Sequence, residues 1–143
     1  MASYVFDTEP LVSFLYREPG HDAVARRLAS VESGDAECLI ADVTAAELFY
    51  LVARIEGRDG GPTQHSLRLA DRDVRSLERA GVGIARVDWD LAGEVKADGG
   101  ISLGDSYAVA LAYHRGDTLV VGGDADFDDL PVEVTVERVG ARS

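Results

Sequence analysis

The order of the expected elements predicts an α/β fold, a three-layer α/β/α sandwich around a mainly parallel sheet of about five strands. Short apolar runs alternate along the chain with longer segments whose apolar residues recur at helical spacing. One of these runs, 118–121, is almost continuously apolar, which is typical of a strand that helices cover on both faces. At 143 residues the chain is long enough for one well-buried core, and we expect one domain spanning 1–143.

The strands are expected where β-branched and aromatic residues cluster between turn residues. The first, at 4–6, combines Tyr4, Val5 and Phe6 and ends at Asp7. Four more follow in chain order, at 37–41, 84–87, 118–121 and 132–136.

The helices are expected in the segments between these strands. Pro10, a residue favoured at helix starts, opens the first helical turn, and a second helix begins after the break at Pro19-Gly20. Thr44 and Glu47 have the spacing of a capping box, which places the start of the third helix there. The helical segments after the first turn are 21–31, one that begins after 42–44, then 63–80, 89–97 and 101–115.

The helix at 101–115 carries the most informative start. Ser102 and Asp105 also have capping-box spacing, so the Ser102 hydroxyl is expected to accept from the Asp105 N–H and the Asp105 carboxylate from the Ser102 N–H. The small residues that follow allow this helix to pack closely on a sheet. Asp105 is therefore expected in the first turn of a mostly buried helix.

Acidic residues stand at the points where strands lead into helices or loops. Asp7 directly follows the first predicted strand, and Asp124 lies in the segment that leaves the strand 118–121 after Gly122 and Gly123. Glu47 and Asp105 are expected in first turns of helices. In open parallel sheets ligands bind beyond the carboxyl ends of the strands, so these acids are candidates for one site. Each also has a structural explanation on its own, as a cap, a capping-box partner or a turn residue.

Four carboxylates in one place require compensation, because neighbouring negative charges raise one another's pKa. The cluster must share protons or bind cations. Carboxylate oxygens suit Mg²⁺ or Mn²⁺, and two such ions about 4 Å apart are able to stabilise both oxygens of a phosphoryl displacement.

The composition excludes several classes of protein. No apolar run approaches the roughly 18 residues of a membrane span, and the start of the chain lacks the basic region of a signal peptide. The single cysteine, Cys38, excludes an internal disulfide and a cysteine zinc cluster. We therefore expect a cytoplasmic protein without a membrane partner. The net charge of −12 argues against passive, nonspecific attraction to nucleic acid.

Four motifs resemble those of PIN-domain ribonucleases. Val5-Phe6-Asp7-Thr8 resembles the opening of the family, and the segments 44–48, 101–110 and 119–127 are similar to its second, third and fourth acidic motifs. The motifs occur in the family's order over nearly the whole chain. Their order and the size of the chain are similar to those of VapC toxins from VapBC toxin–antitoxin pairs.

The resemblance implies a Mg²⁺- or Mn²⁺-dependent endoribonuclease, a hydrolase in which a metal-activated water attacks the RNA phosphate. It further implies a homodimer that a cognate antitoxin protein holds inactive. The residues implied as catalytic groups and metal ligands are Asp7, Glu47, Asp105 and Asp124, with Asp126 as a supporting metal ligand. Thr8 and Ser106 are candidates for positioning the water or a phosphate oxygen, and ordinary hydrogen bonding at a helix start is their alternative role.

Two positions depart from the family pattern. Glu9 stands where a small polar residue is more usual and adds negative charge near the site. Gly104 stands where alanine is frequent, and we expect it to loosen the start of its helix. Neither departure removes a candidate ligand.

Two other functions remain open at this point. A metal-dependent phosphatase or phosphotransferase with Asp7 as its nucleophile also places an acid after the first strand, but such enzymes usually have a lysine near the site, and Lys96 is the only lysine. A catalytically silent PIN-like module that binds another protein is the alternative outside enzymology.

Overall fold

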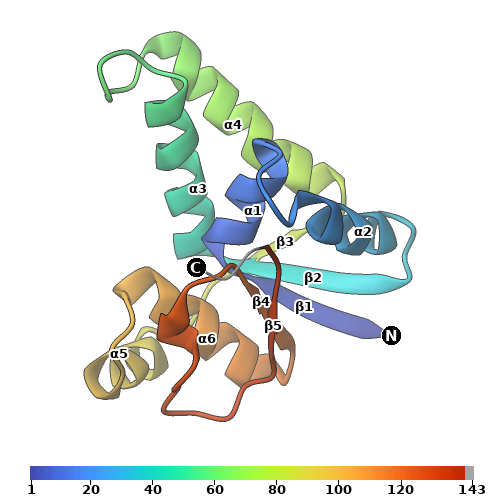
Figure 1. Ribbon diagram of the computed structural model, residues 1–143, viewed down its shortest axis with the longest axis vertical. Helices are drawn as coiled ribbons and strands as arrows, with labels where there is room; N and C mark the ends of the chain where they lie inside the picture. The colour runs from blue at the N-terminus through green and yellow to red at the C-terminus, as the bar shows by residue number, and fades with distance from the viewer. Residues whose placement is uncertain (141–143) are drawn as a thin grey trace.

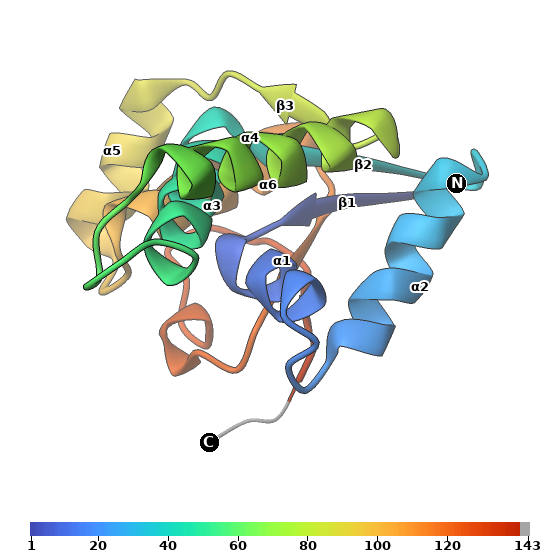
Figure 2. The same cartoon turned by 90° about the horizontal axis from the view of Figure 1, so that it is seen from above.

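The computed structural model describes residues 1–140, and its sheet is parallel throughout. The strands are β1 (Ala2–Phe6), β2 (Ala36–Ala41), β3 (Gly83–Ala85), β4 (Thr118–Val121) and β5 (Val136–Arg138). Within the described chain they form one sheet in the order β3-β2-β1-β4-β5, and every neighbouring pair is parallel. Figure 2 shows β1 and β2 lying side by side, and their pairing is parallel. The predicted five-strand parallel sheet is confirmed.

Six helices cover the two faces of the sheet in the described part of the chain. The bounds are α1 (Thr8–Leu15), α2 (His21–Glu32), α3 (Asp42–Ile55), α4 (Gln64–Arg79), α5 (Trp89–Asp98) and α6 (Leu103–Arg115). The first four pack on one face and the last two on the other (Figure 1). The three-layer sandwich is therefore confirmed. Among the described residues no helix is long and apolar enough to cross a membrane.

The central strand β1 shows why the sequence forms two cores. Successive side chains of a strand point to opposite faces, and Phe6 packs with α1 to α4 while Val5 packs with α5 and α6. In β4, Val120 packs on the face covered by α1 to α4, and Leu119 packs on the face covered by α5 and α6. A strand that is buried on both faces needs apolar residues at every position, which explains the continuous run at 118–121.

Two strands lie elsewhere than the sequence predicts. The third strand is Gly83–Ala85 instead of 84–87, and the last is Val136–Arg138 instead of 132–136. Val132 and Val134 pack on the α6 side of the sheet without joining a strand, so their alternation reflects burial of an irregular segment. Val121 and Arg138 form the last residue pair between β4 and β5, at the carboxyl end of both strands.

The start of α3 corrects a second expectation. The helix begins at Asp42, directly after β2, and its N-cap is Ala41. Glu47 therefore lies in the second turn instead of the first, and the predicted capping box with Thr44 does not form. The Thr44 hydroxyl is buried and has no hydrogen-bond partner in the part of the chain that the structure describes. A threonine and a glutamate three residues apart have the same spacing inside a helix as at its start.

The start of α6 matches half of its predicted capping box. The Asp105 N–H donates to the Ser102 hydroxyl at 3.1 Å, and Ser102 is the N-cap. The reciprocal bond from the Ser102 N–H is not among those of the described residues, so the Asp105 carboxylate is available to the site. Ala108, Ala110 and Ala112 are buried, as expected for a helix packed closely on a sheet.

Candidate metal centre

Asp7 occupies the single residue between β1 and α1. Its N–H donates to the Val120 carbonyl at 3.0 Å, which fixes the backbone beside β4. The residue is only 4% exposed, and its side chain makes no capping bond to α1. Among residues 1–140 no hydrogen-bond partner reaches its buried Oδ1. A buried, unpartnered carboxylate oxygen is costly, and a bound cation or a water would satisfy it.

Asp105 lies close to Asp7 across the end of the sheet. Burial, followed by the charge of Asp105, raises the pKa of Asp7 well above its usual range, and the two carboxyl groups share a hydrogen bond. Burial also raises the pKa of Asp105, although its hydrogen bonds with Ser102 and Asp7 act in the opposite direction. The pair therefore favours a shared proton in the absence of a cation.

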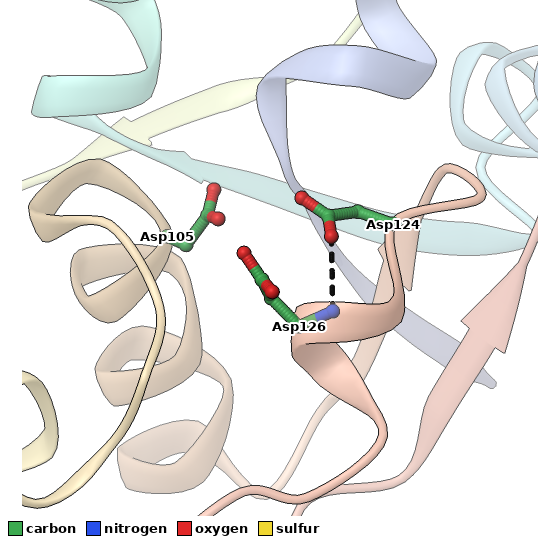
Figure 3. A group of neighbouring side chains, drawn as sticks. All are labelled: Asp105, Asp124 and Asp126. Carbon is green, nitrogen blue, oxygen red and sulfur yellow. Dashed lines mark hydrogen bonds between the residues drawn. The ribbon is translucent and has the colours of Figure 1, made fainter.

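Asp124 and Asp126 approach Asp105 from the loop that leaves β4. The Asp126 N–H donates to Asp124 Oδ1 at 2.9 Å, at the start of the short 3₁₀ helix Ala125–Phe127. Carboxylate oxygens of the three aspartates lie within 4.8 Å of one another, and Figure 3 shows the side chains pointing toward one another. The charges of Asp124 and Asp126 also contribute to the raised pKa of Asp105.

Glu47 reaches the same region from the second turn of α3. The Thr8 hydroxyl donates to Glu47 Oε1 at 3.1 Å. Burial raises the pKa of Glu47, the hydrogen bond from Thr8 opposes this shift, and the charge of Asp105 adds to it. The four predicted acids and Asp126 are thus brought to one end of the sheet, and their roles as ligands remain predictions.

Gly104 makes room for the Glu47 carboxylate. A Cβ at this position would lie 2.6 Å from Glu47 Oε2 and 2.7 Å from its Cδ, closer than real side chains allow. The glycine therefore permits close contact between α3 and the first turn of α6. The second departure, Glu9, places its carboxylate against the backbone of Gly122, where a Cβ would also collide with it.

The two predicted positioning residues differ in their contacts. The Thr8 hydroxyl donates to Glu47, so it orients a candidate ligand. The buried Ser106 hydroxyl donates to the Ser102 carbonyl at 2.8 Å, which is the ordinary helix-start bond stated as its alternative role. A role for either in orienting substrate remains a prediction.

Arg138 was missed by the sequence analysis. It ends β5, and its guanidinium contacts the loop that carries Asp124 and Asp126. The predicted last strand stopped at residue 136, so no sequence signal connected this arginine with the acidic loop.

The residues fit a divalent cation. The donors are carboxylate oxygens, which Mg²⁺ and Mn²⁺ prefer. Carboxylate oxygens of Asp105, Asp124 and Asp126 lie within 4.8 Å of one another, so one ion could contact all three. The unpartnered Asp7 oxygen, and the pKa values of Asp7, Glu47 and Asp105, which are raised first by burial and then by neighbouring carboxylates, favour a bound cation.

The fold and this cluster define an α/β protein with a carboxylate site at the carboxyl edge of a parallel sheet. Residues 4–133 match the PIN domain model, and the chain belongs to the PIN domain family. No curated protein sequence matches the chain.

Solved structures similar to the chain include toxin–antitoxin complexes. The VapBC2 complex of Rickettsia felis, bound to a DNA fragment from its promoter, contains a chain with a TM-score of 0.67 and 16% identity, covering 96% of this chain and 98% of that one. A chain of DNA-bound VapBC from Salmonella typhimurium has a TM-score of 0.69 and 14% identity, and the match again covers 96% of this chain and 98% of that one. PAE2754 from Pyrobaculum aerophilum has a TM-score of 0.57 and 16% identity, and the match covers 87% of this chain and 82% of that one. At these identities the likeness establishes the fold and a structural similarity to VapC toxins.

Proposed function

We propose that this protein is a Mg²⁺- or Mn²⁺-dependent endoribonuclease that hydrolyses RNA phosphodiesters in the cytoplasm. The observation that carries the proposal is the convergence of five carboxylates on one end of a PIN-domain sheet: two from helix starts, one from the second turn of α3 and two from the loop after β4. The pKa values of three of them, Asp7, Glu47 and Asp105, are raised by burial and by neighbouring carboxylates, which favours a bound cation.

Asp7, Glu47, Asp105 and Asp124 are the residues that we propose hold the cation, with Asp126 supporting them. A bound Mg²⁺ or Mn²⁺ would favour loss of a proton from a water, which activates that water for attack on a phosphate, and it would neutralise charge on the phosphate oxygens. Asp7 would hold the cation through its unpartnered Oδ1, and the proton that it shares with Asp105 would be released to solvent. Thr8 holds Glu47 in place through its hydroxyl.

The same proposal extends to partners. The similar structures from Rickettsia felis and Salmonella typhimurium are VapBC complexes, and this supports a role as the toxin of a type II toxin–antitoxin pair. We therefore propose a cognate antitoxin as the inhibitory partner and a homodimer as the working assembly.

The phosphatase alternative is weakened by the surroundings of Asp7. Such enzymes usually have a lysine near the nucleophile, whereas the charges that act most on Asp7 are those of Asp105 and Glu47. The only lysine of the sequence, Lys96, lies in α5. The raised pKa values also disfavour a silent binding module, because a site without metal chemistry gains nothing from clustering acids at a cost to stability.

RNA cleavage by the purified protein tests the proposal. We expect cleavage with Mg²⁺ or Mn²⁺, none with a chelator, and none for Asp105→Asn at unchanged circular dichroism. Asp98→Asn, at the exposed end of α5, is the matched control and should cleave normally. Unaltered cleavage by Asp105→Asn, or hydrolysis of small phosphomonoesters in place of RNA, would overturn the proposal.

A further inference from the structure

Arg138 bridges three points of the loop that carries two of the candidate ligands. Its Nη1 donates to the carbonyl oxygens of Gly122 at 3.3 Å and of Asp124 at 2.6 Å. Its Nη2 forms an ion pair with the Asp128 carboxylate. The guanidinium thus contacts the beginning, the middle and the end of the segment 122–128.

The register of β5 puts this side chain where the loop begins. Arg138 pairs with Val121, the last residue of β4, and points to the α6 face, as does Val136 two residues earlier. Phe127, buried on that face, anchors the other side of the loop. A shift of one residue in the register would turn Arg138 to the opposite face.

The loop needs such an anchor. It starts with Gly122 and Gly123, whose backbones are intrinsically free, and it brings Asp124 and Asp126 toward Asp105. Like charges repel, so without restraint the loop is expected to move its carboxylates away from Asp105 when no cation is bound. The planar fork of arginine holds several acceptors at fixed angles, which a lysine ammonium does not.

We propose that Arg138 is a positioning residue that fixes Asp124 and Asp126 in the geometry that the cation requires. The inference rests on the proposed metal site and extends it to a group that touches neither the cation nor the substrate. The guanidinium acts through the loop backbone and through Asp128.

The direction in which cation affinity changes when Arg138 is replaced distinguishes a positioning role from an effect of its charge. A positive group near a cation site repels the cation, so removing its charge alone should tighten binding. Loss of the anchor should weaken binding. Arg138→Met removes charge and fork together, whereas Arg138→Lys keeps the charge and loses the fork. Positioning predicts weaker binding in both variants, and a pure charge effect predicts tighter binding in the first and no change in the second.

The experiment is a titration with Mn²⁺ alone, by calorimetry and by electron paramagnetic resonance, below the unfolding temperature of each variant. We expect Kd to rise about 10- to 100-fold for both variants, the usual effect of losing a group that orients metal ligands. We also expect faster amide exchange at Asp126, whose N–H bonds to Asp124. If Arg138→Met folds too weakly to titrate, the Arg138→Lys result decides.

Glu137→Gln is the matched control. Glu137 precedes Arg138 in β5, points to the other face and pairs with Arg27 at 2.6 Å, so it anchors the same strand without touching the loop. Its Kd for Mn²⁺ should stay within about twofold of wild type. An equal loss in this control, or wild-type or tighter affinity in Arg138→Met, would overturn the inference alone. Failure of the wild-type protein to bind Mn²⁺ would overturn the proposed function and this inference with it.

Discussion

Asp7 is the site residue whose ionisation the folded protein disfavours most. Its burial and its proximity to Asp105 favour a proton that an exposed aspartate would have released. In the unfolded chain its pKa is about 3.9, so above that value the folded protein binds more protons than the unfolded one. The free energy of unfolding of the metal-free protein must then fall as pH rises from there through the raised pKa. Glu47 and Asp105 act in the same direction.

Asp7→Asn removes this cost and the proposed ligand together. In chelator, denaturant unfolding should show the variant to be more stable than wild type by on the order of 1 kcal/mol at about pH 8, with a smaller loss of stability between about pH 5 and pH 8. Calorimetric titration should show no binding of Mn²⁺. Asp98→Asn should match wild type in both measurements. Lower stability of Asp7→Asn at the higher pH would contradict the electrostatic account.

Gly104→Ala tests the contact between α3 and α6. Alanine in a helix is normally more stable than glycine by about 0.5–1 kcal/mol, but here the added Cβ collides with the Glu47 carboxylate. We expect Glu47 to be displaced and the affinity for Mn²⁺ to fall about tenfold, measured by calorimetric titration.

Gly93→Ala provides the control for this substitution. Gly93 lies in α5, and its Cβ would meet nothing within 4 Å among the described residues. This variant should gain the usual about 0.5–1 kcal/mol and bind Mn²⁺ as wild type does. Normal Mn²⁺ binding by Gly104→Ala would show that Glu47 does not depend on the glycine.

The site residues were predictable to the extent that local sequence determines them. Asp7 and Asp124 were found because they follow buried strands, and Asp105 because it follows a helix cap. Glu47 was predicted through a capping-box pattern that does not form; its side chain nevertheless lies near Asp105, and its role as a ligand stays a prediction. Arg138 could not be found, because its contacts depend on the pairing of β5 with β4.

At the scale of elements, α3 begins earlier than its sequence pattern predicts, and this reverses the expected effect of a mutation. If Thr44 formed a capping box, its replacement would lower the free energy of unfolding by about 1 kcal/mol. In the structure its hydroxyl is buried without a partner among the described residues, and such a group costs about 1–3 kcal/mol.

Thr44→Val should therefore raise the free energy of unfolding by about 1 kcal/mol, because it removes the unpartnered hydroxyl and keeps the shape of the side chain. Ser66→Ala is the contrasting variant. Ser66 is equally buried but forms a capping box with Thr63, so its loss should destabilise the protein by about 1 kcal/mol. Urea denaturation measures both. Destabilisation by Thr44→Val would indicate that the hydroxyl has a partner after all.

The remaining differences between prediction and structure concern edges of the sheet. The interior strands β1, β2 and β4 were placed within two residues because burial on both faces leaves an unbroken apolar run. The edge strands β3 and β5 have three residues each, and their bounds are set by pairing with a neighbour, which composition does not encode.

At the scale of the whole molecule, the strand order joins the two ends of the sequence. β1 lies in the middle of the sheet, flanked by β2 and by β4, which follows more than a hundred residues later. Asp7 therefore meets Asp105 only after most of the chain has folded around it.

This arrangement has a consequence for synthesis. A nascent chain on the ribosome exposes Asp7 and Glu47 long before Asp124, Asp126 and Arg138 have been translated. A nuclease of the proposed kind is consequently inert until β4 and the segment 122–138 have left the ribosome. It is able to cleave the transcript that encodes it only after β5 has been translated and has paired with β4.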